Sequence, residues 1–227
     1  MNNPFGQIEN WVFDLDNTLY PPECGLYQYM DARIRRFVAR ALGLPEDEAH
    51  RVQKGYFRSH GTTLAGMMAD HDTDPYEYLE DVHQFPLEKL GSAPRLAGRI
   101  AALPGRKIIF TNADAPYARR ALAALELDNI FEIIVDIHAC NYSPKPSESA
   151  YDTLLDLTGI NPARTIFFED MARNLAPAKA RGMTTVWINN GSELGDLADG
   201  FGHVDHQTDN LAAYLDDAIE ALETQAA

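Results

Sequence analysis

The sequence predicts an α/β protein with a Rossmann-like parallel sheet as its core and an α-helical cap domain inserted after the first strand. From residue 96 onward, short apolar runs alternate with segments of helical periodicity, a pattern typical of a parallel sheet with helices on both faces. Residues 21–94 carry helical patterns alone, bounded by proline and glycine. We therefore predict a core of residues 1–20 and 95–227 and a helical cap of residues 21–94. Such a cap would lie over the carboxyl ends of the strands, where α/β folds bind ligands.

Five apolar runs have the composition and length of buried strands. They are Trp11–Phe13, Ile108–Phe110, Phe131–Val135, Ile166–Phe168 and Thr184–Ile188. Segments of helix length separate the later runs, namely Ala115–Leu125, Ser147–Leu157 and Ala172–Arg181. A last amphipathic pattern, from Leu211 to Leu222, predicts a terminal helix that packs on the core.

The predicted cap contains four amphipathic patterns of helix length. They span Tyr27–Leu42, Glu46–Arg58, Thr62–Ala69 and Pro75–Gln84. In the first pattern, Ile34, Phe37 and Leu42 recur at helical spacing and define one apolar face. We therefore expect a helical domain here, with no strand that extends the sheet.

The composition narrows the classes of protein to which this chain can belong. Its 227 residues suffice for one large core, or for a core with a smaller companion domain. The formal net charge of −15 argues against non-specific nucleic-acid binding, which requires a basic surface. No apolar run is long enough to span a membrane, and the first residues carry no secretory signal. Cys24 and Cys140 lack C-x-x-C spacing, so we expect reduced thiols and a cytoplasmic location, without a nucleic-acid or membrane partner. The sequence leaves the oligomeric state open.

Polar residues directly follow three of the predicted strands, at Asp14 and Asp16, at Thr111 and Asn112, and at Glu169 and Asp170. Lys145 lies in sequence between the second and third of these three strands and is flanked by two prolines. Taken singly, such residues are common as turn residues, helix caps or solvated loop lysines. Because the carboxyl ends of parallel strands meet at one edge of a sheet, we expect all of them to form one site.

The two aspartates that follow the first strand can divide a phosphoryl-transfer reaction between them. Asp14 can attack phosphorus and form an aspartyl-phosphate, which splits one difficult step into two. Asp16 can protonate the leaving oxygen and then deprotonate the attacking water. A phosphate ester is an anion, so carboxylates alone would repel it. We expect Mg²⁺ to be held by Asp14, Asp170 and the backbone carbonyl of Asp16, because this hard cation prefers oxygen ligands.

The remaining polar residues are expected to bind the phosphoryl group. Lys145 supplies a compact positive charge that Asp14 and the phosphoryl group can share. Thr111 and Asn112, together with nearby backbone N–H groups, are expected to hold the transferring oxygens.

The polar residues at the strand ends resemble the four sequence motifs of the haloacid-dehalogenase-like hydrolase superfamily, and the resemblance covers nearly the whole chain. Three stretches resemble its pyrimidine 5′-nucleotidase branch more closely: Phe13-Asp14-Leu15-Asp16-Asn17-Thr18-Leu19-Tyr20-Pro21, Gly61-Thr62-Thr63-Leu64-Ala65-Gly66 and Phe110-Thr111-Asn112-Ala113. The second stretch lies in the cap, where members of the superfamily differ most. The resemblance implies Mg²⁺-dependent dephosphorylation of nucleoside monophosphates, with the first aspartate as nucleophile and the second as acid/base.

The chain departs from the pattern of these relatives at two positions. It has Glu169-Asp170 where the superfamily often has two aspartates. We therefore expect Asp170 to be the direct metal ligand and Glu169 to bind a metal-bound water. Asn174, one helical turn later, is expected to orient this acidic loop. Tyr117 stands where the branch more often has histidine.

The favoured interpretation is a Mg²⁺-dependent phosphatase whose substrates are pyrimidine nucleoside 5′-monophosphates. Thr62, Thr63 and Met67 are the expected substrate contacts in the cap. A phosphatase of another small ester, such as a sugar phosphate, or a phosphoryl transferase would use the same catalytic residues. Dehalogenation is disfavoured because Asp16 supplies an acid/base that halide departure does not need. A non-catalytic binding module would be expected to lack one of the acidic or basic residues of the site, all of which are present.

Overall fold

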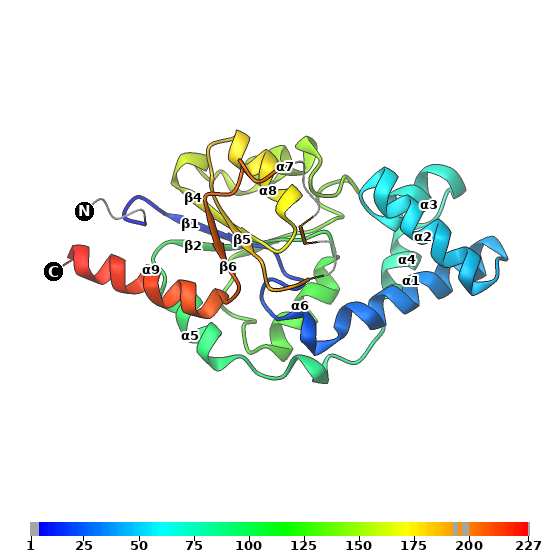
Figure 1. The fold of residues 1–227 in the computed structure, drawn as a ribbon, viewed down its shortest axis with the longest axis horizontal. Coiled ribbons are helices and arrows are strands. Elements are labelled where there is room, and N and C mark those ends of the chain that lie inside the picture. Colours follow the sequence, from blue (N-terminus) through cyan, green and yellow to red (C-terminus); the bar gives the residue numbers. More distant parts are fainter. Residues whose placement is uncertain (1–4, 193–194, 197–199, 227) are drawn as a thin grey trace.

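The computed structural model describes residues 5–192, 195–196 and 200–226, and the parts of the predicted core at 1–4, 193–194, 197–199 and 227 lie outside the described residues. Within the described residues, six parallel strands form one sheet in the order β3-β2-β1-β4-β5-β6. The strands are β1 (Asn10–Phe13), β2 (Arg106–Phe110), β3 (Ile133–Val135), β4 (Thr165–Glu169), β5 (Thr184–Ile188) and β6 (His206–Thr208). The predicted α/β fold with a parallel sheet is confirmed (Figure 1).

Two edge strands differ from the sequence prediction. The sequence does not predict β6, because His206-Gln207-Thr208 contains no apolar residue and pairs with β5 alone at the edge of the sheet. The predicted run Phe131–Val135 is wrong at its start, since β3 begins only at Ile133. Phe131 instead packs edge-on against the ring of Phe13, with ring centroids 5.8 Å apart. Its apolar character therefore reflects packing on the core, outside the strand.

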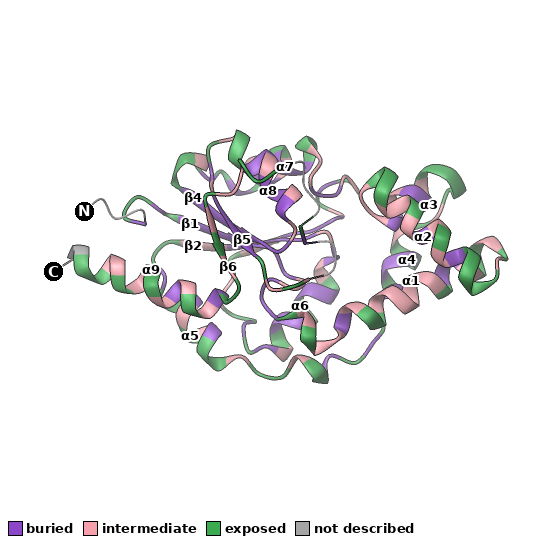
Figure 2. Ribbon diagram, viewed as in Figure 1, coloured by how far each residue is buried: buried purple, intermediate pink, exposed green. Residues whose placement is uncertain are grey.

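Alternate residues of the central strands face two separate cores. Trp11 and Phe13 point into one core and Val12 into the other, so β1 is buried on both faces. The first core lies under helices α5 (Pro94–Ala102), α6 (Ala115–Ala124) and α9 (Leu211–Ala226), and the second under α7 (Glu148–Thr158) and α8 (Ala172–Ala180). In the part of the chain that the structure describes, three short 3-10 helices lie in connections, η1 (Pro22–Cys24), η2 (Glu88–Leu90) and η3 (Pro162–Arg164). Figure 2 shows the central strands buried between helices whose outer faces are exposed.

The inserted segment folds into four helices that share one apolar cluster, to which Ile137 of the core also belongs. They are α1 (Leu26–Leu42), α2 (Glu46–His60), α3 (Thr63–His71) and α4 (Pro75–Val82). Phe37, Leu64, Met67 and Leu79 belong to this cluster, and the group lies to one side of the sheet in Figure 1. All four predicted cap helices are present, with ends within two residues of the expected ones. Among the described residues, none of the helices combines the length and apolar character that crossing a membrane requires.

The register of the sheet brings three strand ends to one place. β1 lies between β2 and β4, and Phe13 is aligned with Ile109 on one side and Phe168 on the other. The residues that follow these positions therefore leave the sheet together. Asp14 continues the ladder by one bond, since its N–H donates to the carbonyl oxygen of Phe168 at 2.9 Å. This alignment positions the candidate site.

The turn before β2 provides a test of how closely the central strands pack. Gly105 has φ of 77°, and a Cβ atom there would lie 2.1 Å from the backbone oxygen of Glu9. Gly105→Ala is therefore expected to lower the free energy of unfolding by about 2–4 kcal/mol, through left-handed strain and a clash with the backbone. Urea unfolding followed by circular dichroism measures this change.

Gly98→Ala is the matched control for this substitution. Gly98 lies on the exposed side of α5, and no atom lies within 4 Å of the position of its added Cβ. The control is expected to raise the free energy of unfolding by about 0.5–1 kcal/mol, because alanine is the better helix former. Equal effects of the two substitutions would contradict the assigned close contact.

Candidate active site

The turn after β1 fixes the carboxylate of Asp14. The chain reverses direction here, with Asn17 at φ 59° and the N–H of Leu19 bonded to the carbonyl oxygen of Leu15 at 3.0 Å. This turn brings the hydroxyl of Thr18 to within 3.1 Å of Asp14 Oδ2, to which it donates. The same hydroxyl accepts a hydrogen bond from the N–H of Asp170 at 3.1 Å. Thr18 therefore links the loops that follow β1 and β4.

Lys145 is the buried cation of the site, and its side chain is only 1% exposed. Its Nζ donates to Asp14 Oδ1, Glu169 Oε2 and the carbonyl oxygen of Phe110, each at 2.7 Å. These three acceptors follow or end β1, β4 and β2, respectively. Burial disfavours the charged form of Lys145, but the two carboxylates outweigh burial and raise the pKa of the ammonium. All three Nζ donors are thereby satisfied by the protein.

The loop that carries Lys145 is held in place by Asn112. The side-chain Oδ1 of Asn112 accepts from the Lys145 N–H at 2.7 Å, and its Nδ2 donates to the Lys145 carbonyl oxygen at 3.2 Å. The amide of Asn112 thus clamps the lysine backbone, and the contact of Asn112 with a phosphoryl group stays a prediction. Thr111 is also engaged locally, because its Oγ1 accepts from the N–H of Ala113 at 3.0 Å. Asn112 lines the cavity described below, whereas Thr111 does not.

Three buried carboxylates gather beside this lysine. Asp14, Glu169 and Asp170 each offer an oxygen, and these oxygens lie within 4.8 Å of one another. Burial, together with the charge of Glu169, raises the pKa of Asp14 from 3.8 to about 7 against the opposing effect of Lys145. Burial and the charges of Glu169 and Asp14 also raise the pKa of Asp170. One ammonium leaves this cluster with excess negative charge, which a divalent cation would neutralise.

The donor set around these carboxylates fits a hard metal ion. Asn174, which is 2% exposed, carries a side-chain Oδ1 with no hydrogen-bond partner among the described residues. Its backbone N–H bonds the carbonyl oxygen of Met171 at 2.9 Å, so Asn174 contacts the acidic loop from α8. Both carboxylate oxygens of Glu169 are engaged, one by Lys145 and one by the N–H of Met171 at 3.1 Å. The carboxylate of Asp16 lies outside this cluster.

Asp16 is instead held by two tyrosine hydroxyls. Tyr117 donates to Asp16 Oδ1 at 2.8 Å, Tyr20 donates to the same oxygen, and the two hydroxyls lie 3.0 Å apart. Burial raises the pKa of both tyrosines well above the usual value, so the hydroxyls remain donors. His83 stacks on the ring of Tyr117 with centroids 4.4 Å apart, and its Nδ1 lies 2.8 Å from Asp114, which caps α6.

Sequence patterns do not predict either tyrosine as a site residue. Tyr20 follows the first motif directly, and Tyr117 is visible in the sequence only as a departure from the branch pattern. The contact of Tyr117 with Asp16 joins residues 101 positions apart. It arises because α6 begins at the carboxyl end of β2, next to the turn that follows β1.

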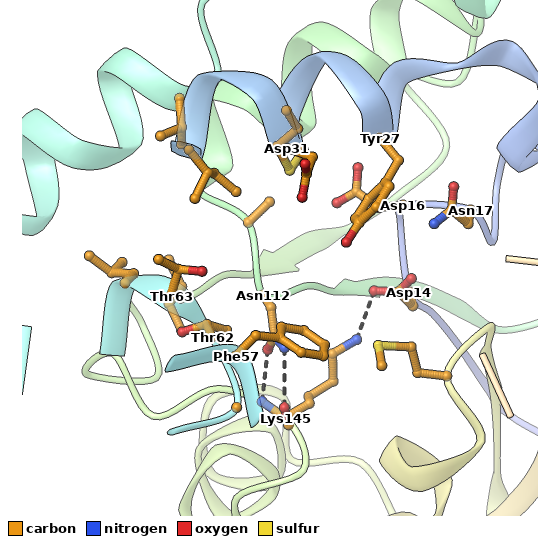
Figure 3. A pocket seen from close by; sticks show the side chains of 18 of the residues that line it. Asp14, Asp16, Asn17, Tyr27, Asp31, Phe57, Thr62, Thr63, Asn112 and Lys145 are labelled. Carbon is orange, nitrogen blue, oxygen red and sulfur yellow. Dashed lines mark hydrogen bonds and ion pairs between the residues drawn. The ribbon is translucent and has the colours of Figure 1, made fainter. Parts of the chain in front are cut away.

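A cavity of about 210 Å³ opens between the carboxyl edge of the sheet and the cap. Asp14, Asp16 and Lys145 line it from the core, and Thr62 and Thr63 line it from α3 and its N-terminal cap (Figure 3). Thr62 caps the helix by accepting from the N–H of Ala65 at 3.1 Å. The third residue expected from the cap, Met67, is fully buried in the apolar cluster of the cap and does not line the cavity.

This fold and the acidic and basic residues at its carboxyl edge define a class of hydrolase. The sequence model of the haloacid dehalogenase-like hydrolase family matches residues 8–182. The chain therefore belongs to that family, in agreement with the resemblance of its motifs. The match to the pyrimidine 5′-nucleotidase branch stays a prediction.

Relatives and solved structures of the same fold carry several activities in their names. Phosphate metabolism protein 8 of Saccharomyces cerevisiae is 24% identical over 194 residues, which are 76% of this chain and 59% of that protein. This chain thus spans less than two thirds of the relative it matches. The HAD phosphatase of Thermococcus onnurineus has a TM-score of 0.63 at 19% identity, covering 94% of this chain and 99% of that one. CbbY of Rhodobacter sphaeroides in complex with phosphate has a TM-score of 0.63 at 22% identity, covering 92% and 99%.

The buried ion pairs of Lys145 make a prediction about stability. Lys145→Met leaves two buried carboxylates without their counter-ion, and it is expected to lower the free energy of unfolding by about 3–5 kcal/mol. Burial raises the pKa of Asp14 from 3.8 to about 7 in the folded state, so ionisation of Asp14 lowers the free energy of unfolding as the pH rises from about 4 to about 7. The loss in Lys145→Met should therefore be larger at about pH 8 than at about pH 5, measured by urea unfolding in EDTA.

Lys179→Met is the matched control. Lys179 forms an exposed ion pair with Asp205, with Nζ and Oδ1 2.5 Å apart and the lysine side chain 41% exposed. Its removal is expected to cost no more than about 1 kcal/mol at either pH. If Lys145→Met cost no more than this control, the assigned role of the buried cation would be wrong.

Proposed function

We propose that this chain is a Mg²⁺-dependent phosphatase that hydrolyses small phosphate monoesters through a phosphorylated Asp14. The observation that carries the proposal is the placement of this carboxylate at the cavity, with Oδ1 bound by Lys145 and Oδ2 by Thr18. Each carboxylate oxygen has a further lone pair, so these bonds orient the nucleophile without consuming it. Both the family and the four motif positions support a hydrolase with this chemistry.

The residues of the site can perform both halves of the reaction. In the first, an Asp14 oxygen bonds to phosphorus while the bond from phosphorus to the leaving oxygen breaks, and Asp16 gives that oxygen a proton. In the second, Asp16 takes a proton from water as the water oxygen attacks phosphorus, and the bond to Asp14 breaks. Lys145 stays protonated throughout and offsets negative charge beside the transferred group. Tyr20 and Tyr117 hold Asp16 where these proton transfers occur.

Asp14 and Asp170, with the backbone carbonyl of Asp16, are the proposed ligands of Mg²⁺. When bound, the ion supplies positive charge that neutralises the phosphoryl oxygens. The excess negative charge of the cluster and the unpartnered Oδ1 of Asn174 support this assignment. The two hydrogen bonds that occupy Glu169 support an indirect role for that residue.

Pyrimidine nucleoside 5′-monophosphates are the substrates that the motif resemblance favours. The rival substrate class is a sugar phosphate, because CbbY of Rhodobacter sphaeroides, with the same fold at 20% identity, was solved in complex with xylulose-(1,5)bisphosphate. A phosphoryl transferase would use the same residues and would pass the phosphoryl group to a second hydroxyl. An L-2-haloacid dehalogenase of Xanthobacter autotrophicus also has the fold, with a TM-score of 0.52 at 17% identity over 83% of this chain. The acid/base placement of Asp16 favours phosphate chemistry over that reaction.

The domain bounds and the cellular location form part of the same proposal. We assign residues 21–94 to the cap and residues 1–20 and 95–227 to the catalytic core. Apart from Ile137, the buried residues of the third apolar cluster all lie within residues 21–94, which supports this division. Cys24 and Cys140 are free thiols, which supports a cytoplasmic setting.

Phosphate release tests the proposal directly. Purified protein is incubated with UMP, CMP, AMP and several sugar phosphates, with Mg²⁺ or with EDTA, and inorganic phosphate is measured. Release should require the metal, and Asp14→Asn should lower kcat by at least about 10³-fold, because the amide is not a nucleophile. Asp156→Asn, at an exposed position of α7, should leave the rate unchanged. Turnover by Asp14→Asn at the wild-type rate would refute the nucleophile assignment.

The hydrogen bond from Tyr117 to Asp16 predicts that the effect of removing it depends on the leaving group of the substrate. Tyr117→Phe removes the 2.8 Å hydrogen bond to Asp16 while keeping the ring. It is expected to lower kcat/KM, which reports the first half of the reaction, about tenfold for alkyl phosphates, whose leaving oxygen needs a proton. For 4-nitrophenyl phosphate the change should be about twofold or less, since that leaving group departs without one.

Tyr29→Phe serves as the control, because Tyr29 is 42% exposed and does not line the cavity. It should leave both rates unchanged. Equal losses with both kinds of substrate in Tyr117→Phe would indicate a purely structural role for the tyrosine.

A further inference from the structure

The cap wall of the cavity carries a polar cluster that the catalytic steps do not use. Asp31 lies on α1, and Gln53 and Lys54 lie on α2; all three line the cavity. Asp31 Oδ1 accepts from Gln53 Nε2 at 2.8 Å and from Lys54 Nζ at 2.9 Å. Figure 3 shows Asp31 pointing from α1 into the cavity, on the side opposite Lys145. The cluster therefore faces the catalytic residues across the space that a substrate would fill.

Gln53 is the member of this cluster that indicates a ligand. It is 3% exposed, and its side-chain Oε1 has no hydrogen-bond partner among the described residues. Its orientation is fixed, since its Nε2 donates to Asp31 and its backbone oxygen accepts from the Thr63 hydroxyl at 3.3 Å. Buried polar groups are almost always paired, so an unpaired one in a cavity wall indicates a donor supplied from outside the chain.

The charge of the cluster limits what that ligand can be. Lys54 is balanced by Asp31, so the pair adds no net positive charge to this wall. A second phosphate would meet the carboxylate of Asp31 and the acceptor oxygen of Gln53, both of which repel it. Hydroxyl and N–H groups are donors, and in dinucleotide-binding α/β folds a carboxylate binds a ribose hydroxyl in this way.

Arg173 is the cation that could bind a second phosphate group of the substrate. It lines the same cavity from α8, and its guanidinium lies over the ring of Phe57, 4.8 Å from the centroid. A distal anion that reached Arg173 would make a bisphosphate the preferred substrate. The experiment below therefore includes one.

We infer that Asp31 and Gln53 form a leaving-group subsite, which accepts hydrogen bonds from the O–H or N–H groups of an uncharged leaving group. The substrate class is thus the monophosphate of a sugar or nucleoside, and a second phosphate is disfavoured. This inference rests on the proposed phosphatase function. It assigns specificity to α1 and α2, in addition to Thr62 and Thr63.

Substitutions at the two residues test the subsite through substrate ratios. Gln53→Met removes the acceptor with little change in volume, and Asp31→Asn removes the carboxylate. For each variant, kcat/KM for ribose 5-phosphate and for UMP is divided by kcat/KM for acetyl phosphate, which carries no donor on its leaving group. The ratio should fall about three- to tenfold in Gln53→Met and at least about tenfold in Asp31→Asn, since bonds to charged acceptors are stronger.

Two exposed residues supply matched controls. Gln28→Met on α1 and Asp47→Asn on α2 repeat the same substitutions at exposed positions that do not line the cavity. Both controls should keep the wild-type ratios. Circular dichroism checks that each variant is folded, and if Gln53→Met does not fold, Asp31→Asn decides the outcome.

Three further substrates identify the donor and test the charge argument. If the kcat/KM ratio for ribose 5-phosphate falls in the variants, the donor is a sugar hydroxyl. If the ratio falls for UMP but not for its N3-methyl derivative, the donor is the N–H of the base. Either result supports the subsite. Wild-type protein should also prefer fructose 6-phosphate to fructose 1,6-bisphosphate, and the reverse preference would overturn the inference in favour of Arg173.

The failure of the subsite is distinguishable from the failure of the phosphatase. Turnover of acetyl phosphate with unchanged ratios in both variants would overturn the subsite and leave the phosphatase intact. Absence of phosphate release from every substrate, acetyl phosphate included, would overturn the proposed function and the subsite with it.

Discussion

The buried ammonium of Lys145 is the interaction on which the candidate site depends. It joins Asp14 after β1, the Phe110 carbonyl at the end of β2 and Glu169 at the end of β4. Removing these charges from water is costly, so the arrangement persists only because every donor has a partner. The same contacts fix the orientation of Asp14. A single cation thereby holds three strand ends together and leaves the carboxylate of Asp14, the proposed nucleophile, facing the cavity.

The acid/base candidate is tied to both parts of the fold. Asp16 lies where the chain leaves the sheet for the cap, and Tyr117 reaches it from α6 of the core. The return connection from the cap is bound to the same helix, because Arg120 donates to the carbonyl oxygens of His83 and Phe85 at 3.3 and 3.0 Å. His83 also stacks on Tyr117. The position of Asp16 is therefore coupled to the connection that returns from the cap to the sheet.

An acidic chain can still present a site for anions because the local field differs from the net charge. The formal charge of −15 belongs to the whole surface, whereas the cavity holds Lys145, Lys54 and Arg173 beside its carboxylates. Lys145 offsets part of the charge of Asp14 and its acidic neighbours, and a bound cation would offset the rest. The cap wall differs, since its lysine is neutralised locally. The two ends of the cavity therefore offer different chemistry, charged at the sheet and hydrogen-bonding at the cap.

The sequence by itself determined the parallel sheet, the helical insertion and the clustering of Asp14, Glu169 and Asp170, because periodicity and strand order place strand ends at one edge. It missed β6, an edge strand that buries no apolar face. Only the tertiary structure decided which groups those residues meet. The amide of Asn112 clamps the Lys145 loop. Helix α4 packs beside α1, and Met67 lies in the apolar cluster that these helices share. Such contacts join residues far apart in the chain, and helix packing, unlike local periodicity, sets their distances.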